Sequence, residues 1–233
     1  MDRLDKFLCD SGAGTRSQVK AILKAGRVNV DGKPEKDGSR KIDPQTQTVT
    51  LDGEVLGGKR RVVVMLNKPA GFVTATEDAR QKTVMELLPK EWAHQDLRPV
   101  GRLDKETEGL LLFTNDGDFA NALMHPSHEV KKTYHVWVQG YYPGAEIRLS
   151  KPITLDGYAI RPPHIERLWE KGNRAKFCVT IHEGRNRQIR RMCEAAGMQV
   201  TRLLRIREGN LSLGELPSGA WRYLTPEEVQ ELR

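Results

Sequence analysis

The chain has 233 residues, of which 38% are hydrophobic, and a formal net charge of +7. No apolar run approaches the ~18 residues of a membrane span, and the first residues contain no apolar signal core. The three cysteines, Cys9, Cys178 and Cys193, are too few and too far apart for a disulfide framework. We therefore expect a cytoplasmic protein, long enough for one large domain or for a small domain joined to a medium one.

A small unit is predicted for residues 1–57, and a second domain for residues 58–233. The expected helices of the first unit are Leu4–Cys9 and Arg16–Ala25, and its expected strands are Val28–Val30 and Thr48–Leu51. The stretch 53–61 contains Gly57, Gly58 and three successive basic residues, which is typical of a linker.

The second expected helix has one basic face. Its cations recur every four residues, which places them along one side of a helix: Arg16, Lys20 and Lys24. The segments Arg3–Leu8, Gly14–Val19 and Ile22–Gly32 resemble the S-four-like domain, a small RNA-binding domain named after a ribosomal small-subunit protein. This resemblance implies RNA contacts from Arg3, Arg16, Lys20, Lys24 and Arg27.

The second domain mixes strands and helices without a regular βαβ alternation, so we expect an α+β domain. Its expected strands are Val62–Leu66, Leu110–Phe113, Thr133–Gln139, Lys176–Ile181 and Gln199–Ile206. Its expected helices are Val84–Leu88, Phe119–Met124 and Arg187–Ala196. The strand at 133–139 alternates apolar Tyr134, Val136 and Val138 with other residues, as in a sheet with one wetter face.

Asp104 lies in a tight polar turn that leads directly into the apolar strand 110–113. Residues at the entry of a buried strand are held by a rigid scaffold and can still reach a ligand. Arg102 and Lys105 place positive charge close to this carboxylate, which suits a nucleophile or a proton acceptor. An aspartate in a charged turn can equally be solvated or cap a helix, so the position alone leaves both roles open.

Residues 183–207 are strongly basic. This stretch contains seven arginines and only two glutamates, which gives a net charge of +5 over 25 residues. Planar guanidinium groups bind phosphates in a bidentate manner and stack on bases, so RNA or DNA is the expected partner. A solvated basic surface is the alternative. The chain contains no nucleotide-binding glycine motif and no metal-ligand spacing, so we expect neither cofactor nor metal.

Four segments resemble the pseudouridine synthases: Lys68–Gly71, Gly101–Asp104, Lys132–Tyr134 and Glu183–Met192. Together with the leading S-four-like domain, they are similar to the branch that modifies bacterial ribosomal RNA, the RsuA and RluB type. The resemblance covers nearly the whole chain. It implies a catalytic domain built on a mixed, mainly antiparallel sheet flanked by helices.

The same resemblance implies a role for individual residues. Asp104 would be the catalytic residue that attacks or otherwise activates the target uridine, and Tyr134 would stack on the uracil. Arg185 would pair with Asp104, although Arg187, at a position where many relatives have histidine, leaves that assignment open. Further contacts with substrate or RNA would come from Arg102, Ile189, Lys68, Pro69, Arg190 and Arg191.

The sequence thus predicts an enzyme that isomerises a uridine of ribosomal RNA, acting as a monomer on the RNA or on an assembling ribosomal particle. A non-catalytic RNA-binding or assembly protein is one alternative, and it leaves Asp104 without a role. A hydrolase that uses Asp104 with Glu106 or Glu108 is the other, and it would release a free base or a cleaved strand.

Overall fold

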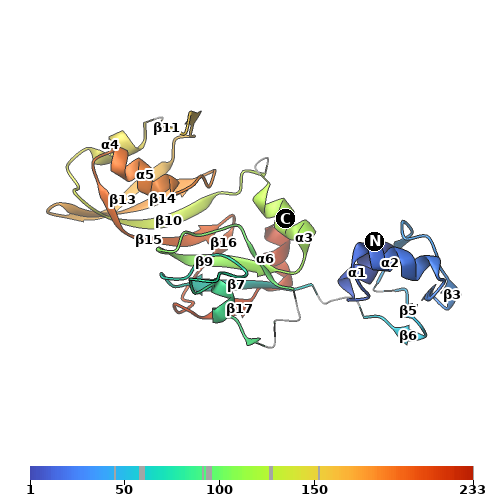
Figure 1. Cartoon of the computed structure of the whole chain (residues 1–233). Helices are drawn as coiled ribbons and strands as arrows, with labels where there is room; N and C mark the ends of the chain where they lie inside the picture. The colour runs from blue at the N-terminus through green and yellow to red at the C-terminus, as the bar shows by residue number, and fades with distance from the viewer. Residues whose placement is uncertain are drawn as a thin grey trace. The chain divides into compact units, whose positions relative to one another are not determined.

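A computed structural model describes residues 1–44, 46–57, 61–90, 92, 96–125, 128–151 and 153–232. The chain divides into two compact units, Met1–Arg60 and Arg61–Arg233, which are described separately (Figure 1). The predicted boundary, after residue 57, lies slightly before this division.

The N-terminal unit combines two helices with short antiparallel strands. The helices are α1 (Leu4–Asp10) and α2 (Arg16–Lys24). A four-stranded sheet has the order β3-β2-β5-β6, with β2 (Val28–Val30), β3 (Lys33–Pro34), β5 (Val49–Leu51) and β6 (Glu54–Val55). A separate pair consists of β1 (Asp2–Arg3) and β4 (Lys41–Ile42).

Two local features of this unit can be traced to its sequence: the start of α2 and the end of the small sheet. A capping box starts α2, because the Thr15 hydroxyl accepts from the Gln18 backbone N–H and the Gln18 side chain accepts from the Thr15 N–H at 2.8 Å. The linker was expected at residues 53–61, which begins too early in the sequence. Val55 pairs with Thr50, so residues 54 and 55 form strand β6. A hairpin therefore occupies part of the glycine-containing stretch.

The second unit is built on a nine-stranded sheet with the order β13-β14-β10-β15-β9-β7-β17, to which β16 and β8 attach at β15 and β9. The first half of its strands in the chain comprises β7 (Val63–Lys68), β8 (Arg98–Val100), β9 (Thr107–Thr114) and β10 (Lys132–Gln139). The second half comprises β13 (His164–Lys171), β14 (Arg174–Ile181), β15 (Gln199–Glu208), β16 (Leu211–Ser212) and β17 (Trp221–Tyr223).

Among these strands, β9 and β15 pair in parallel and the other pairs are antiparallel. The expected mixed, mainly antiparallel sheet is confirmed. A two-stranded hairpin, β11 (Thr154–Leu155) and β12 (Tyr158–Ala159), stands apart from it.

The helical segments of this unit are short. They are the 3₁₀ helix η1 (Val84–Leu87), α3 (Gly117–Met124), α4 (Ala145–Leu149), α5 (Gln188–Ala195) and α6 (Pro226–Glu231). In the described part of the chain, no helix combines the length and the apolar character that a membrane span requires.

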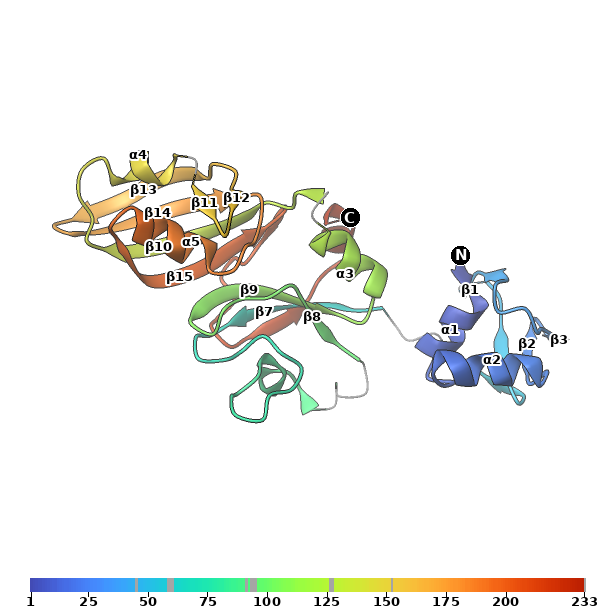
Figure 2. The ribbon, with the colours of Figure 1, turned by 45° about the horizontal axis from the view of Figure 1, so that its top comes forward.

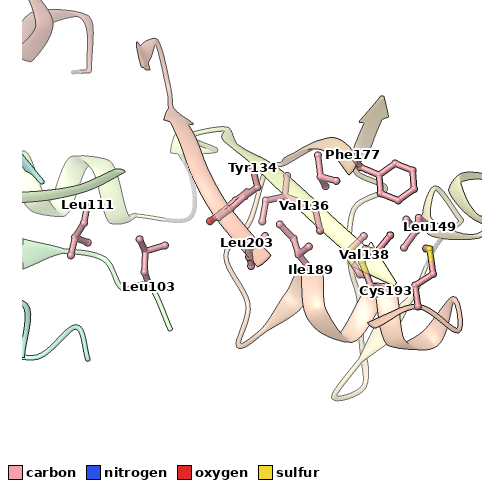
Figure 3. Close-up of a cluster of buried hydrophobic side chains, with 14 of the residues drawn as sticks. Leu103, Leu111, Tyr134, Val136, Val138, Leu149, Phe177, Ile189, Cys193 and Leu203 are labelled. Carbon is pink, nitrogen blue, oxygen red and sulfur yellow. The ribbon is translucent and has the colours of Figure 1, made fainter. Parts of the chain in front are cut away.

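Two buried clusters lie against β7 and β9. Val64 and Leu66 belong to one cluster, and their neighbours Val63 and Met65 belong to the other. Because successive side chains of a strand point to opposite faces, both faces of these central strands are covered. In the first cluster, Ile189 of α5 packs with residues of β10, β14 and β15, as the close-up shows (Figure 3). Figure 2 shows α5 near those strands.

Strand β9 approaches β15 very closely at one glycine. Gly109 pairs with Arg205 and has φ +104°. A Cβ atom at Gly109 would lie 2.2 Å from the carbonyl oxygen of Arg205. Glycine is therefore required at the point where the Asp104 turn enters the sheet beside β15.

Candidate active site

A cavity of about 610 Å³ brings together four segments that are far apart in the sequence. It lies among the Asp104 turn, strand β10, the turn before α5 and strand β15. The predicted site residues that line it are Arg102, Asp104, Tyr134, Arg185, Arg187 and Ile189. Its other polar lining residues include Lys132, Gln188, Arg205 and Glu208.

The turn that carries the half-buried Asp104 is held from two sides. On one side, the Thr74 hydroxyl accepts from the Leu103 N–H at 3.2 Å and donates to the Leu103 carbonyl at 2.7 Å. On the other side, the Lys68 ammonium donates to the carbonyls of Lys105 and Thr107 at 3.1 and 2.9 Å. These contacts fix the backbone immediately before and after Asp104.

Lys68 is fully buried, and Pro69 follows it at the end of β7. Burial lowers the pKa of the Lys68 ammonium to about 8, although the nearby carboxylates of Glu106, Asp104 and Glu108 act in the opposite direction. Neither Lys68 nor Pro69 is among the residues that line the cavity. The Lys68 ammonium, from which a substrate or RNA contact was expected, instead donates to three backbone carbonyls, including that of Pro69 at 3.0 Å, and supports the Asp104 turn.

Arg190 is the arginine of α5 that reaches the Asp104 turn. Its Nη2 donates to the Glu106 carbonyl at 3.0 Å and its Nη1 to the Val200 carbonyl at 3.5 Å. Burial lowers the pKa of its guanidinium, while the charges of Asp104 and Glu106 raise it. Arg190 was expected to bind RNA; in the structure its guanidinium contacts the Asp104 turn and interacts electrostatically with Asp104.

Arg185 and Arg187 line the cavity but form no ion pair with Asp104 in the described part of the chain. Arg185 lies with its Nε 3.7 Å from a Glu183 carboxylate oxygen, and its Cζ lies 3.4 Å from the centre of the Tyr158 ring. Arg187 is exposed and has φ 49° at the N-cap of α5. This left-handed turn sets the phase of the helix, so that Ile189 and Arg190, rather than the two earlier arginines, face inward. The expected pairing of Arg185 or Arg187 with Asp104 is thus not formed among the described residues, and it stays a prediction.

Tyr134 lies on the inner face of β10, with 7% of its surface exposed. Its neighbours in the alternation, Val136 and Val138, are buried on the same face, as predicted. Burial raises the pKa of the Tyr134 hydroxyl, so the side chain is a neutral phenol near neutral pH. Tyr134, Leu203 and Ile189 lie beside one another in the buried cluster (Figure 3).

A buried polar group behind Tyr134 was not predicted. Arg205 donates from Nε to the Leu110 carbonyl at 2.7 Å, and its Nη2 lies 3.3 Å from a carboxylate oxygen of Glu208. The other Glu208 oxygen lies 3.7 Å from the ammonium of Lys132. In the sequence, Arg205 stands out only as part of a basic stretch. Its spacing of two residues from Leu203, in a strand next to an apolar one, was the signal for an inward side chain.

The described residues hold no group of three or more His, Cys, Asp or Glu side chains that could bind a metal ion. The cavity instead offers carboxylates, a phenol and several guanidinium groups. These groups can contact a base by stacking and hydrogen bonding and can contact the phosphates of a nucleic acid.

The predicted RNA contacts outside the cavity fall into two classes. Arg16, Lys20 and Lys24 on α2 are exposed and form no ion pair among the described residues. The other cations have carboxylate partners: Arg3 with Asp5, Arg27 with Asp52, and Arg191 with Asp156.

Comparison with known proteins gives two family matches. Residues 62–195 match the RNA pseudouridylate synthase family, and residues 2–47 match the S4 domain. The first match includes Asp104, Tyr134 and α5, and the second includes both helices of the N-terminal unit.

Individual relatives align over almost the whole chain. The chain is 42% identical to an uncharacterized RNA pseudouridine synthase of Bacillus subtilis, YtzG, over 99% of this chain and 98% of that protein. It is 39% identical to ribosomal large subunit pseudouridine synthase B of Yersinia pestis (100% and 75% covered) and to ribosomal small subunit pseudouridine synthase A of Vibrio parahaemolyticus (99% and 99%). A crystal structure of a pseudouridylate synthase superposes with a TM-score of 0.68, at 31% identity, and both chains are fully covered.

Proposed function

Because this chain belongs to the RNA pseudouridylate synthase family, we propose that it isomerises a specific uridine of ribosomal RNA to pseudouridine. The substrate class follows from two relatives whose names specify ribosomal RNA of the large and of the small subunit. The N-terminal S4 domain would supply a second RNA contact. The enzyme would act in the cytoplasm as a monomer, on ribosomal RNA or on an assembling ribosomal particle.

The observation that carries this proposal is the meeting of Asp104, Tyr134 and Ile189 in one cavity. A carboxylate, an aromatic ring and an aliphatic side chain together can hold a flat base and act on the atoms at its edge. Arg190 adds a positive charge next to Asp104. The cavity can accept a base only after the base has left the RNA stack. Arg102, which is exposed and lines the cavity beside Asp104, would help to displace the base from the stack.

The reaction rearranges one nucleotide. The bond between N1 of the uracil and C1′ of the ribose breaks, and a bond between C5 and the same C1′ forms. C5 loses its hydrogen and N1 gains one, so the composition does not change and no co-reactant is needed. Asp104 would attack or otherwise activate the nucleotide so that the first bond breaks, while Tyr134 and Ile189 hold the base as it turns. A neutral, buried phenol is suited to assist the proton transfer at C5.

The test compares wild-type protein with Asp104→Asn on ribosomal RNA from cells that lack this protein. Pseudouridine is mapped by carbodiimide labelling and reverse transcription, and RNA affinity is measured in parallel. We expect a single stop with wild type, none with Asp104→Asn, and equal affinities. Asp118→Asn, at an exposed position of α3 outside the cavity lining, is the matched control and keeps the stop.

Each other outcome contradicts one part of the proposal. No stop with wild type, on free RNA and on assembling subunits, makes the protein an RNA-binding module. A stop with both proteins removes Asp104 from catalysis. Release of free uracil, or cleavage of the strand, indicates a hydrolase.

A further inference from the structure

Three polar residues that line the cavity have no part in the proposed reaction: Lys132, Arg205 and Glu208. Tyr134 of β10 lies directly across from Arg205 of β15 in the antiparallel register, and Lys132 lies across from Glu208. Arg205 is 2% exposed and Glu208 is 4% exposed. Burial removes the hydration of both charges, so such a pair seldom stabilises a protein more than apolar residues would. A role other than stability is therefore the more informative explanation of this pair.

Arg205 is held rigidly. Its Nε hydrogen bond to the Leu110 carbonyl anchors it to β9, and Glu208 lies 3.3 Å from its Nη2. Gly109 lets β9 come close enough for that anchor, since any Cβ there would overlap the Arg205 backbone. The guanidinium is therefore fixed by two strands and a carboxylate.

The fixed guanidinium lies across from the phenol, because Tyr134 and Arg205 are cross-strand partners, both are buried and both line the cavity. The Nη2 of Arg205 makes no hydrogen bond to any described residue, so the guanidinium has a donor to spare. A guanidinium has donors and no acceptor, so a hydrogen bond between these two side chains would run from Arg205 to the Tyr134 oxygen. The hydrogen of the Tyr134 hydroxyl is then left for an acceptor elsewhere, on the open side of the ring where the cavity lies.

We propose that Arg205 is a positioning residue, which holds the hydroxyl of Tyr134 so that its hydrogen points into the part of the cavity that Asp104 lines. Arg205 would act through Tyr134 and would not touch the substrate. This inference rests on the proposed function, because it assigns Tyr134 a part in the reaction. The alternative is a purely structural pair, in which Arg205 only neutralises Glu208.

A double-mutant cycle separates the two roles. The variants are Arg205→Lys, Tyr134→Phe and their combination, and the readouts are the single-turnover rate and the RNA dissociation constant. Lysine keeps the buried positive charge opposite Glu208, but its single ammonium lacks the second arm that a guanidinium bound to Leu110 can extend toward Tyr134. Arg202→Lys is the control, since Arg202 is on the same strand, pairs with Glu108 at 2.9 Å and does not line the cavity.

A positioning role predicts that Arg205→Lys lowers the rate about tenfold or more with an unchanged dissociation constant, and that it has no further effect on Tyr134→Phe. A structural role predicts the same loss in both backgrounds, which would overturn the proposal. Equal rates for Arg205→Lys and wild type would overturn it as well.

A second measurement needs no activity. Tyrosine labelled isotopically at Cζ gives one NMR signal per residue, and Tyr134→Phe identifies the signal of Tyr134. Because the Cζ shift follows the hydrogen bonding of the phenol oxygen, Arg205→Lys should move this signal and Arg202→Lys should not. An unmoved signal would overturn the proposal. If wild type forms no pseudouridine, the proposed function fails, while this spectrum still decides whether Arg205 holds Tyr134.

Discussion

Arg190 donates from Nη2 to the backbone carbonyl of Glu106 at 3.0 Å, which ties helix α5 to the turn that carries Asp104. The same guanidinium is half-buried, and it interacts electrostatically with Asp104. Two segments more than eighty residues apart are thereby joined at the candidate catalytic group. Positioning and electrostatic stabilisation are combined in one side chain.

Arg190→Gln should lower the single-turnover rate by about a hundredfold or more, as loss of an oriented charge in an active site commonly does. RNA affinity should change less than about threefold, because most of the basic surface remains. Arg190→Lys should retain part of the rate. Arg222→Gln is the control: Arg222 is another partly buried arginine, pairs with Glu228 at 2.6 Å and does not line the cavity.

Equal rates for Arg190→Gln and Arg222→Gln would show that the charge near Asp104 is not used. A rate that falls only in proportion to RNA affinity would return Arg190 to the RNA-binding role that the sequence suggested. Quench-flow kinetics at saturating RNA distinguish these results.

The parts of the site that were predicted correctly depend on local patterns. Tyr134 points inward because a period of two residues sets the faces of β10, and that period can be read from Tyr134, Val136 and Val138 alone. Asp104 enters the cavity because it stands at the start of a wholly apolar strand, which must be central in the sheet. The mixed sheet itself followed from the family resemblance rather than from periodicity.

The parts that were missed depend on contacts between distant segments. Arg190 rather than Arg185 reaches the turn that carries Asp104, through the Glu106 carbonyl. The left-handed φ of 49° at Arg187, which starts this helix, is not indicated by any local pattern. The Lys68 ammonium donates to the carbonyls of Lys105 and Thr107, in a turn distant in the sequence, and no local pattern indicates these contacts. Strand β13 was missed because it is exposed on both faces and shows no alternation.

The buried ammonium of Lys68 should make stability depend on pH. Its folded-state pKa, about 8, lies below the ordinary value of 10.5, so the unfolded chain binds the proton more tightly. The cost of burying the charge is complete below pH 8 and disappears as the pH rises through 10.5. The free energy of unfolding of wild type should therefore rise by about 2 kcal/mol between pH 7 and pH 10, relative to Lys68→Met.

Urea unfolding of both proteins across this pH range measures the difference. Lys68→Met is expected to be less stable overall, since the carbonyls of Lys105 and Thr107 lose a donor. The slope with pH, rather than the absolute stability, is the test. A constant difference between the two proteins would mean that Lys68 titrates at its ordinary pKa.

Gly109→Ala should be strongly destabilising. The added Cβ would lie 2.2 Å from the Arg205 carbonyl oxygen, and the strands would have to separate beside the cavity. We expect a loss of more than about 3 kcal/mol, from overpacking together with the unfavourable φ. Gly219→Ala supplies the control, because Gly219 also has a positive φ, +80°, but no atom within 4 Å of the added Cβ.

Gly219→Ala should lose only the conformational part, about 1 kcal/mol. Chemical denaturation measures both variants. Similar losses in the two would contradict the close approach of β9 and β15 at Gly109.

The cations of the N-terminal unit should contribute unequally to RNA binding. Arg16, Lys20 and Lys24 are exposed on α2 and have no ion-pair partner among the described residues, whereas Arg3 and Arg27 are engaged by Asp5 and Asp52. A cation without a carboxylate partner can neutralise a phosphate and release its counterion, and each such contact adds to the salt dependence of binding.

Substituting glutamine for Arg16, Lys20 or Lys24 should lower the slope of log affinity against log salt by about 1. Substituting Arg3 or Arg27 should change it less. Filter binding of a ribosomal RNA fragment at four salt concentrations gives these slopes, and a larger effect at Arg3 or Arg27 would mean that RNA displaces their carboxylates and binds along a different face of the unit.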